Sequence, residues 1–569
     1  MSKMSNMTGH VNTRRTPQSD PILGREKDMT KNAAGGYSFT VDNWSRLSRF
    51  LILGSEGGSY YVTERELTKQ NAQAVLDCLA EDGLRTVQTI VAVSDEGRAP
   101  KNTPAIFALA MAAKMGDDDT RKAALAAVPK VCRIGTHLFQ FAEAIKAFGG
   151  FGRGTQRALA SWYTDSPEHK VALQVVKYQS RDGWSHRDIL RKAKPSGHER
   201  GSTMDHILGW AAGKWAPGDL PLGDASDLIW AFEQAKAVGL DTVNKAGASK
   251  VVNLINDYRL PREAIPTQYL NEVAVWEALL DNGGRGMPMT AMVRNLPKMT
   301  HLGMFSGNSA AATSVMARIK DEDAIRGARL HPLNILVAMR TYGSGHGVRG
   351  SLTWTPNRGI VDALDSAFYK SFQTVTPTGK RFLLALDVSG SMQGANMAGL
   401  PGLDCREASG AMAMITDAVE DNTHIIGFTS GGSNFFGSSR GRWGGGDGVS
   451  ELDLSARRRL DDNIRTITNL PFGGTDCALP MIYARQKKMP VDVFVIYTDS
   501  DTWANPNMHP VQALDAYKQT MGIDAKMIVV GMVSNGYSIA DPKRRDMLDI
   551  VGMDTTVPNI MSEFALGNI

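Results

Sequence analysis

The stretch 384–393 reads LALDVSGSMQ, an apolar run that ends in an aspartate and is followed at once by small hydroxyl residues. It is part of a set of short, continuous runs rich in aliphatic and β-branched residues, and helix-like segments separate these runs. They are RFLLALD (381–387), THIIGFTS (423–430), VDVFVIYTD (491–499) and AKMIVVGMV (525–533). Such alternation is typical of a parallel sheet covered on both faces by helices. It predicts a doubly wound α/β domain in the C-terminal part of the chain.

The preceding part of the chain, from about residue 37 to 340, carries the pattern of short helices with caps and breakers. Pro104 opens the apolar stretch PAIFALAMAAKM, the acidic run 117–119 suits the start of the next helix, and Gly149 ends a later one. Helix pairs recur every roughly 35 to 45 residues without a fixed sequence repeat. This pattern predicts an irregular α-solenoid, in which each pair buries its apolar face by stacking on its neighbours.

Length and composition set the broad class of the protein. With 569 residues, 42% of them hydrophobic, the chain is long enough for two or more domains. No apolar run approaches the roughly 18 to 20 residues needed to cross a bilayer, and the polar N-terminus lacks a signal-peptide core. The four cysteines lie far apart without a CxxC pair, which argues against a zinc ribbon or a disulfide framework. We expect a soluble cytoplasmic protein without a membrane segment.

Two segments lack any apolar period. Residues 1–36 are rich in Ser, Thr, Asn and Gly, which predicts a disordered leader. The stretch 431–448 is dominated by glycine and lies between two predicted strands, which predicts a mobile surface loop. The sequence assigns no role to either segment.

Positive charge is concentrated in one short stretch. The net charge of the chain is only +4, too small to mark the whole protein as a nucleic-acid binder. Residues 170–194, KVALQVVKYQSRDGWSHRDILRKAK, hold seven Lys or Arg against Asp182 and Asp188, an excess of five. This local excess is greater than the net charge of the entire chain and predicts a basic patch.

The spacing within this stretch predicts two helices joined by an Asp182-Gly183 turn. In the first, Lys170, Lys177 and Arg181 recur at helical spacing along one polar face. The second begins after Ser185, which forms a capping-box pattern with Asp188, so that His186 and Arg187 fall on a first turn that favours a phosphate. Arg191 follows on the same helix. The alternatives are an ordinary solvated helix surface and a histidine that only caps its neighbours.

Two further segments mix basic and apolar residues, and they supply weaker candidates for a basic surface. They are RLSRFLILGSEGGSYY (46–61), with Arg46 and Arg49, and MVRNLPKMTHLGMF (292–305), with Arg294 and Lys298. These side chains would lie on the inner rim of a curved helical array, or they would be the basic tips of buried helices.

Polar clusters follow three of the predicted strands. They are Asp387, Ser389 and Ser391 after the first strand, Thr475 and Asp476 in PFGGTDCALP, and Asp499 and Asp501 in YTDSDTW. In open α/β sheets, ligands bind outside the carboxyl ends of the strands, where loops converge. Hydroxyls with one or two carboxylates form an oxygen-only site, which suits Mg²⁺ and contains no ligand soft enough to prefer zinc or copper.

The DxSxS spacing, with a distant Thr and a third-strand Asp, resembles the metal-ion-dependent adhesion site of von Willebrand factor A domains. On that resemblance the direct or water-mediated ligands are Asp387, Ser389, Ser391, Thr475 and Asp499. Such sites leave a coordination position open to a partner's carboxylate. The alternative is a serine-rich turn that caps a helix. A phosphoryl-transfer nucleophile would want a second acid at position 389, which is serine, so we do not expect an enzyme.

Several longer segments resemble the Ro sixty-kilodalton autoantigen family in its bacterial or phage form, from about Tyr37 to the C-terminus. They include WSRLSRFLILGSEGGSYY, KYQSRDGWSHRDILRKAKP, HPLNILVAMRTYGSGHGVRG and PTGKRFLLALDVSGSM. The resemblance implies a ring of HEAT-like helical repeats, the TROVE domain, over residues 37–370, closed by a von Willebrand factor A domain over 371–569. In that family the ring binds small Y RNAs on its outer surface, and its hole admits single-stranded 3′ ends of structured or misfolded RNA.

By position, Lys170, Lys177, Arg181, His186 and Arg187 fall in the family's Y RNA-binding helices. Bacterial relatives resemble parts of degradation machines in which a Y RNA tethers polynucleotide phosphorylase, which implies RNA quality control or decay. We therefore expect an RNA-binding scaffold, monomeric within a ribonucleoprotein. The alternative is a metal-dependent protein-interaction module without RNA binding.

Overall fold

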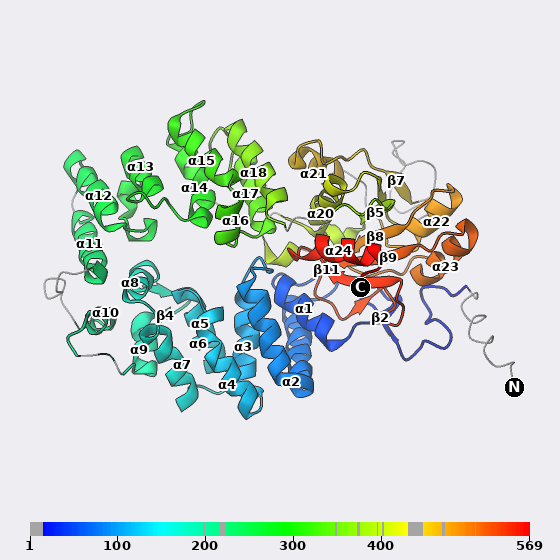
Figure 1. Cartoon of the computed structure of the whole chain (residues 1–569), viewed down its shortest axis with the longest axis horizontal. Coiled ribbons are helices and arrows are strands. Elements are labelled where there is room, and N and C mark those ends of the chain that lie inside the picture. Colours follow the sequence, from blue (N-terminus) through cyan, green and yellow to red (C-terminus); the bar gives the residue numbers. More distant parts are fainter. Residues whose placement is uncertain are drawn as a thin grey trace.

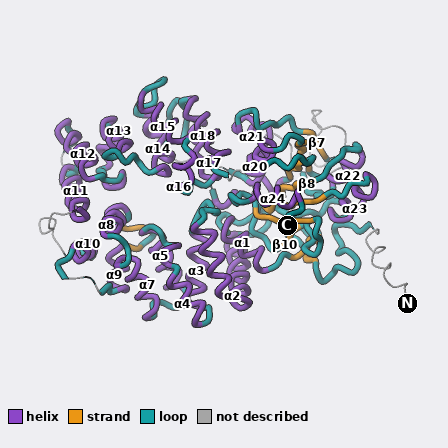
Figure 2. The backbone as a smooth tube through the Cα atoms, in the orientation of Figure 1, coloured by secondary structure: helices purple, strands orange, loops and turns teal. Residues whose placement is uncertain are grey.

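The computed structural model of the chain describes residues 15–569, apart from residues 197, 199, 215–223, 241, 348–349, 373–375, 395, 401–402, 431–447, 469–472 and 507. Figure 1 shows two parts: helices arranged around an opening, and an α/β domain beside them that also receives the N-terminal segment. The tube view separates them by type, with strands gathered in the α/β domain apart from one short hairpin (Figure 2). The predicted glycine-rich loop 431–448 lies outside the described residues, except for Gly448.

The helical part follows the chain around the opening in two arms (Figure 1). The first arm contains α1 (Asn43–Leu53), α2 (Glu64–Asp95), α3 (Thr103–Met115), α4 (Asp118–Ala126), α5 (Val128–Val131), α6 (Gly135–Ala147), α7 (Arg153–Thr164), α8 (Glu168–Lys177), the hairpin β3 (Ser180–Arg181) and β4 (Trp184–Ser185), α9 (His186–Ala193) and α10 (Thr203–Ala211). The second contains α11 (Asp224–Val238), α12 (Lys245–Tyr258), η3 (Arg262–Ala264), η4 (Thr267–Asn271), α13 (Val273–Asp281), α14 (Met289–His301), α15 (Ala310–Lys320), α16 (Glu322–Gly327), α17 (Pro332–Ser344) and α18 (Arg358–Lys370).

Several helix starts follow the predicted chemistry. Pro104 lies in the first turn of α3, where its missing N–H costs no hydrogen bond. The side chain of Asp117 accepts a hydrogen bond from Thr120 N and caps α4. Ser185 and Asp188 form the predicted capping box at the start of α9. These local signals are confirmed because each satisfies backbone N–H groups that have no partner inside the helix.

The two arms meet and close the helical part into a ring. Arg329, which follows α16, forms an ion pair with Asp95 at the end of α2, 2.8 Å apart. Nearby, the imidazole Nε2 of His331 lies 3.0 Å from the carbonyl oxygen of Arg98, and Asn334 Nδ2 donates to Pro100 O. The predicted HEAT-like ring is therefore present, and its closure depends on contacts between residues more than two hundred positions apart.

The α/β domain is built on a mixed, mainly parallel sheet in the order β11-β9-β8-β5-β6-β7, in which only β7 runs antiparallel to its neighbour. Its elements are β5 (Phe382–Asp387), α19 (Gly390–Gly394), η5 (Met397–Gly399), α20 (Cys405–Val419), β6 (Thr423–Phe428), β7 (Val449–Glu451), α21 (Leu460–Thr468), α22 (Leu479–Gln486), β8 (Val493–Thr498), α23 (Pro510–Met521), β9 (Lys526–Gly531), β10 (Tyr537–Ser538), β11 (Met547–Val551) and α24 (Val557–Leu566). The four predicted runs form β5, β6, β8 and β9. Every residue of β5 and β8 is buried, as expected for central parallel strands.

The predicted disordered leader is wrong for residues 15–36, whereas residues 1–14 lie outside the described part. Residues Met29–Lys31 form β1, which pairs with β2 (Tyr37–Thr40), and β2 pairs with β10 of the α/β domain. Gln18 is fully buried, and its Nε2 donates to Asp476 Oδ1 and Met508 O. The polar composition indicated disorder, but these polar side chains find hydrogen-bond partners on the α/β domain.

The described residues bear on two features considered in the sequence, which are membrane-spanning helices and disulfide bonds. Among them, no helix is both long enough and apolar enough to cross a membrane. The four cysteines, Cys78, Cys132, Cys405 and Cys477, are buried and free. The absence of a disulfide framework agrees with the spacing of the cysteines in the sequence.

Candidate RNA-binding surface and metal site

The basic patch predicted at 170–194 folds as two helices joined by a tight hairpin. Strands β3 and β4 pair across Asp182 and Gly183, which both have positive φ, as a two-residue hairpin turn requires. The side chains of Lys170 on α8 and of Arg187 and Arg191 on α9 are exposed. Within the described residues none of these three has an ion pair, so their charges are available to a ligand.

His186 does not belong to this exposed surface. It is 2% exposed and lies against the rings of Phe139 and Trp162, and its Nδ1 is 2.7 Å from the hydroxyl oxygen of Tyr163. Burial lowers its pKa to about 4, so the ring is neutral at pH 7. The prediction that His186 contacts RNA is therefore wrong, because the first turn of α9 faces the core at this position.

Lys177 and Arg181 lie elsewhere than Lys170, although the three share a helical spacing. Both line a cavity of about 920 Å³ inside the ring. The Lys177 ammonium is 3.9 Å from Glu263 Oε2. Among the residues that the structure describes, the exposed Arg181 guanidinium donates only to the neighbouring Ser180 O. The predicted polar face is thus divided between the exposed patch and the interior of the ring.

The cavity lies between the two arms of the ring, and we call it the central cavity. Residues of α2, α3, α6, α8 and the β3–β4 hairpin line it on one side, and residues of η3, α14, α16 and α17 line it on the other. Among the described residues, the basic side chains in this lining are Lys101, Arg133, Lys177, Arg181, Arg262, Arg294 and Arg329, and the acidic ones are Asp182 and Glu263. Arg294 on α14 is exposed and lines this cavity, where an inner-rim residue is expected. Lys298, also on α14, is half-buried and donates to Asn271 Oδ1 at 2.8 Å. Arg262 and Arg329 were not predicted, because they are isolated in sequence and only ring closure brings them together.

Arg49 and Arg46 are not on the inner rim, and their prediction as RNA contacts is wrong. Arg49 is completely buried, with Nη2 2.7 Å from both carboxylate oxygens of Asp549 on β11. Arg46 is half-buried against Gly536, donates to Gln70 O and has its pKa lowered by burial. Both face the α/β domain, so their charges serve the domain interface and not a nucleic acid.

Three of the predicted metal ligands converge at the carboxyl end of β5. Asp387 Oδ1 accepts from Ser389 N at 2.9 Å, and the hydroxyl oxygens of Ser389 and Ser391 are 3.0 Å apart. Gly390 N donates to Gly473 O, which ties this loop to the segment that carries Thr475. All of these side chains, together with Asp499, are buried. The strand order brings them together, since β5 lies between β6 and β8.

The electrostatics of this site favour a hard cation. Burial and the charge of Asp499 raise the pKa of Asp387 to about 7, and burial also raises the pKa of Asp499. A divalent ion would compensate the two carboxylates, and three neutral hydroxyls would complete a set that suits Mg²⁺. No group of three or more His, Cys, Asp or Glu is arranged for a metal among the described residues, so the set depends on its hydroxyls.

Asp476 and Asp501 belong to the same loops but have other partners. Asp476 accepts from Gln18 and Asn505, while Asp501 accepts from the Tyr537 hydroxyl at 2.6 Å and from Ala33 N. These acids hold the N-terminal segment against the loops of the metal site.

Exposed aromatic rings of the helical part flank the metal site. Tyr60 and Tyr61, between α1 and α2, are exposed, and the Tyr60 ring covers Gly394 so closely that a Cβ there would collide with it. Burial and the charges of Asp499 and Asp501 raise the pKa of Tyr61 to about 12. The sequence did not indicate this contribution of the helical part, because it depends on how the two domains pack.

Comparisons with known proteins agree with this architecture. Residues 381–565 match the family model of the Ro60 vWA domain, and residues 30–216 and 257–341 match that of the TROVE domain. The chain is 38% identical to the RNA-binding protein RO60 of Deinococcus radiodurans, over the whole of both chains. The chain belongs to the Ro60 family.

A second relative and a solved structure are similar to this chain over most of its length. The RNA-binding protein RO60 of Caenorhabditis elegans is 35% identical, with 95% of this chain and 90% of that protein covered. The crystal structure of the Deinococcus radiodurans RO (RSR) protein matches with a TM-score of 0.66 and 38% identity, and covers 93% of this chain and 100% of that chain. The fold of the Ro60 family thus extends through both domains.

Proposed function

We propose that this protein is a non-enzymatic RNA-binding scaffold. It holds a small Y-like RNA on the exposed basic patch and admits single-stranded 3′ ends of structured or misfolded RNA to the central cavity. The observation that carries the proposal is the pair of separate basic surfaces, one of exposed and unpaired side chains on α8 and α9, the other gathered from around the ring. The relatives named as RNA-binding proteins support the same function.

The exposed patch has the chemistry that phosphates require. Lys170, Arg187 and Arg191 present exposed cationic groups that have no acidic partner among the described residues. Double-stranded RNA is recognised mostly through its backbone and shape, which a fixed array of cations can match.

The central cavity suits a single strand better than a duplex. Arg181, Arg262 and Arg294 are exposed in it, and none of them has an ion pair among the residues that the structure describes. A volume of about 920 Å³ is enough for a few nucleotides. Guanidinium planes stack on unstacked bases, which a single strand offers and a duplex does not. RNA with a free single-stranded end is therefore the expected ligand.

The metal site supports a second role within the same scaffold. The residues that would hold Mg²⁺ are Asp387, Ser389, Ser391, Thr475 and Asp499. When bound, the ion would supply a positive charge with an open position for an acidic group of a partner protein. Tyr60 and Tyr61 beside it would contact that partner. A metal-dependent protein-interaction module without RNA binding is the competing function.

These roles together fit cytoplasmic RNA quality control or decay, in which a bound RNA brings an exoribonuclease such as polynucleotide phosphorylase to the ring. The first test is the RNA content of the purified protein, measured as the ratio of absorbance at the nucleic-acid and protein maxima, followed by sequencing of any bound RNA. Small structured RNA is expected. A preparation that stays free of nucleic acid and binds no added RNA would favour the competing function.

A further inference from the structure

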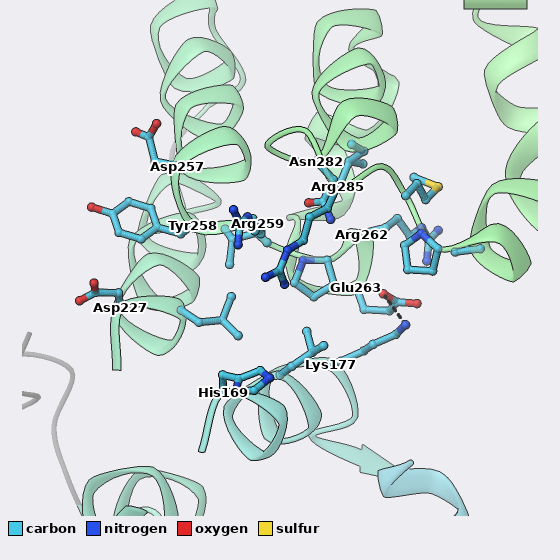
Figure 3. Close-up of a pocket in the computed structure, with 18 residues that line it drawn as sticks. His169, Lys177, Asp227, Asp257, Tyr258, Arg259, Arg262, Glu263, Asn282 and Arg285 are labelled. Atoms are coloured by element: carbon cyan, nitrogen blue, oxygen red, sulfur yellow. Dashed lines mark ion pairs between the residues drawn. The ribbon is translucent and has the colours of Figure 1, made fainter. Parts of the chain in front are cut away.

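A second cavity, of about 600 Å³, lies between α8 and the C-terminal ends of α12 and α13 (Figure 3). It shares Lys177, Arg262 and Glu263 with the central cavity, so it is a recess of that cavity. Its volume falls within the range of pockets that enclose a small organic ligand. The recess is therefore large enough for one nucleotide.

Three guanidinium groups line the recess. Arg259, Arg262 and Arg285 are exposed, and within the described residues none of them forms an ion pair. Figure 3 shows the Arg285 side chain projecting between the second arm of the ring and α8, toward His169. The charge of Lys177 is partly offset by Glu263, 3.9 Å away. Three unpaired guanidiniums on one concave surface indicate an anionic ligand, and planar guanidinium groups suit phosphate in particular.

The backbone holds one of these groups in place. Arg259 caps α12 in the left-handed conformation, with a φ of 58°, and Gly283 after α13 also has a positive φ. A Cβ at Gly283 would lie 2.6 Å from Asn256 O and 3.3 Å from Arg259 Cγ. The two helix ends thus pack closely against the stem of Arg259, which reduces the entropy lost when its guanidinium binds a ligand.

The rest of the lining suits a nucleobase. Half-buried Leu173 and Leu228 provide apolar surface, and the nearly fully buried Leu260, Leu279 and Met287 complete the apolar wall. Bases in single-stranded RNA are held by stacking on aromatic rings or on guanidinium planes. The arginines supply such planes here, whereas the Tyr258 ring packs against Trp230 and points away from Arg285 (Figure 3). Asp227 and Asp257 also line the recess and would repel a chain of several phosphates. The combination favours a ligand with one base and one phosphate.

We propose that this recess binds one phosphorylated nucleoside: a nucleotide of a single-stranded RNA that has entered the central cavity, or a free nucleoside monophosphate of the same chemistry. The RNA source of the ligand rests on the function proposed above, whereas the binding of a free nucleotide does not. Arg259, Arg262 and Arg285 hold the phosphate, and the apolar lining receives the base.

The test compares the parent protein with a variant that carries Arg259→Asn and Arg285→Gln. Asparagine tolerates the left-handed backbone at position 259, and circular dichroism and thermal unfolding establish that the variant is folded. The control carries Arg358→Gln and Arg465→Gln, which remove two exposed charges elsewhere. The probes are a fluorescein-labelled ten-nucleotide RNA, a blunt-ended RNA hairpin, adenosine monophosphate, uridine monophosphate and adenosine.

The recess variant is expected to lose at least about tenfold in affinity for the ten-nucleotide RNA, while the control and the affinity for the blunt hairpin stay within twofold of the parent. Each monophosphate should compete with the short RNA on the parent, and adenosine without phosphate should not. Equal affinity of the recess variant and the control for the short RNA and both monophosphates overturns the inference. If the parent binds the monophosphates but no RNA, the inference holds for free nucleotides and the proposed RNA-binding function is wrong. If the parent binds none of these probes, both the inference and the proposed function are wrong.

Discussion

Arg49 on α1 of the helical ring and Asp549 on β11 of the α/β domain form a buried ion pair, in which one guanidinium nitrogen lies 2.7 Å from each carboxylate oxygen. Arg49 also donates to the side chain of Asn535 at 2.6 Å and to Tyr537 O at 2.9 Å. All of these acceptors belong to the α/β domain. This arginine therefore joins the two domains, and the Asp549 carboxylate neutralises its charge.

Removing Arg49 should destabilise the protein and leave RNA affinity unchanged. Arg49→Met leaves the Asp549 carboxylate unpaired at the domain interface, and breaking such a buried pair costs about 3 kcal/mol of unfolding free energy. Urea unfolding measures this loss, and Arg121→Met, which breaks an exposed pair on α4, is the control. A variant as stable as the control, or one that is stable but binds RNA more weakly, would contradict the assignment of Arg49 to the interface.

His186 should make the protein more stable at pH 7 than at pH 5. Its pKa is about 4 in the folded protein against about 6.5 when unfolded, so between these values the unfolded state binds more protons. Stability is retained above about pH 6.5 and is lost as the pH falls toward 4. Half-buried His137 and buried His331 shift in the same direction, so His186→Gln should reduce this pH dependence without abolishing it. Urea unfolding at several pH values measures the slope, and an unaltered slope in the variant would show that His186 is solvated.

Asp387→Asn should stabilise the protein in the presence of EDTA and remove its response to Mg²⁺. The substitution eliminates the repulsion between two buried carboxylates and keeps an oxygen that can accept from Ser389 N. Thermal unfolding with and without Mg²⁺ measures both effects, and Asp453→Asn on the exposed surface is the control. We expect Mg²⁺ to raise the melting temperature of the parent and control only. An equal rise in the Asp387 variant would remove this residue from the metal site.

Gln18→Ala should weaken the attachment of the N-terminal segment. Its amide nitrogen donates to Asp476 and to Met508 O, and its amide oxygen accepts from Thr502 Oγ1 at 2.6 Å. Loss of these buried hydrogen bonds leaves their partners unsatisfied, at about 1 to 3 kcal/mol each for a buried group. Limited proteolysis should then cut within residues 15–36 faster than in the parent. Identical cleavage rates would restore the interpretation of this segment as a disordered leader.

The sequence predicted features that depend on neighbouring residues. The strands β5, β6, β8 and β9, the turn at Asp182 and the capping box at Ser185 each have a local chemical reason, and each is present. The cluster of Asp387, Ser389 and Ser391 was also predictable, because the carboxyl ends of parallel strands share one edge of the sheet.

Other features were beyond prediction because they depend on distant contacts. The helical spacing of Lys170 and Lys177 gave no indication that one would be exposed and the other would line the ring. His186 and Arg49 are polar residues whose burial requires partners on other elements, Tyr163 and Asp549. The basic lining of the central cavity has no sequence signature, since its arginines come from separate helices that ring closure brings together.

The most direct test of RNA binding by the exposed patch is the salt dependence of affinity for a structured RNA. The parent is compared with a triple variant, Lys170→Ala, Arg187→Ala and Arg191→Ala, and with a control that loses three exposed charges of the α/β domain, at Arg457, Arg465 and Lys487. Because each phosphate contact releases counterions, the slope of log Kd against log salt should fall by about two to three in the triple variant, with a loss of affinity of at least about tenfold. The control should match the parent. A triple variant whose slope and affinity equal those of the control would show that the exposed patch does not bind the RNA.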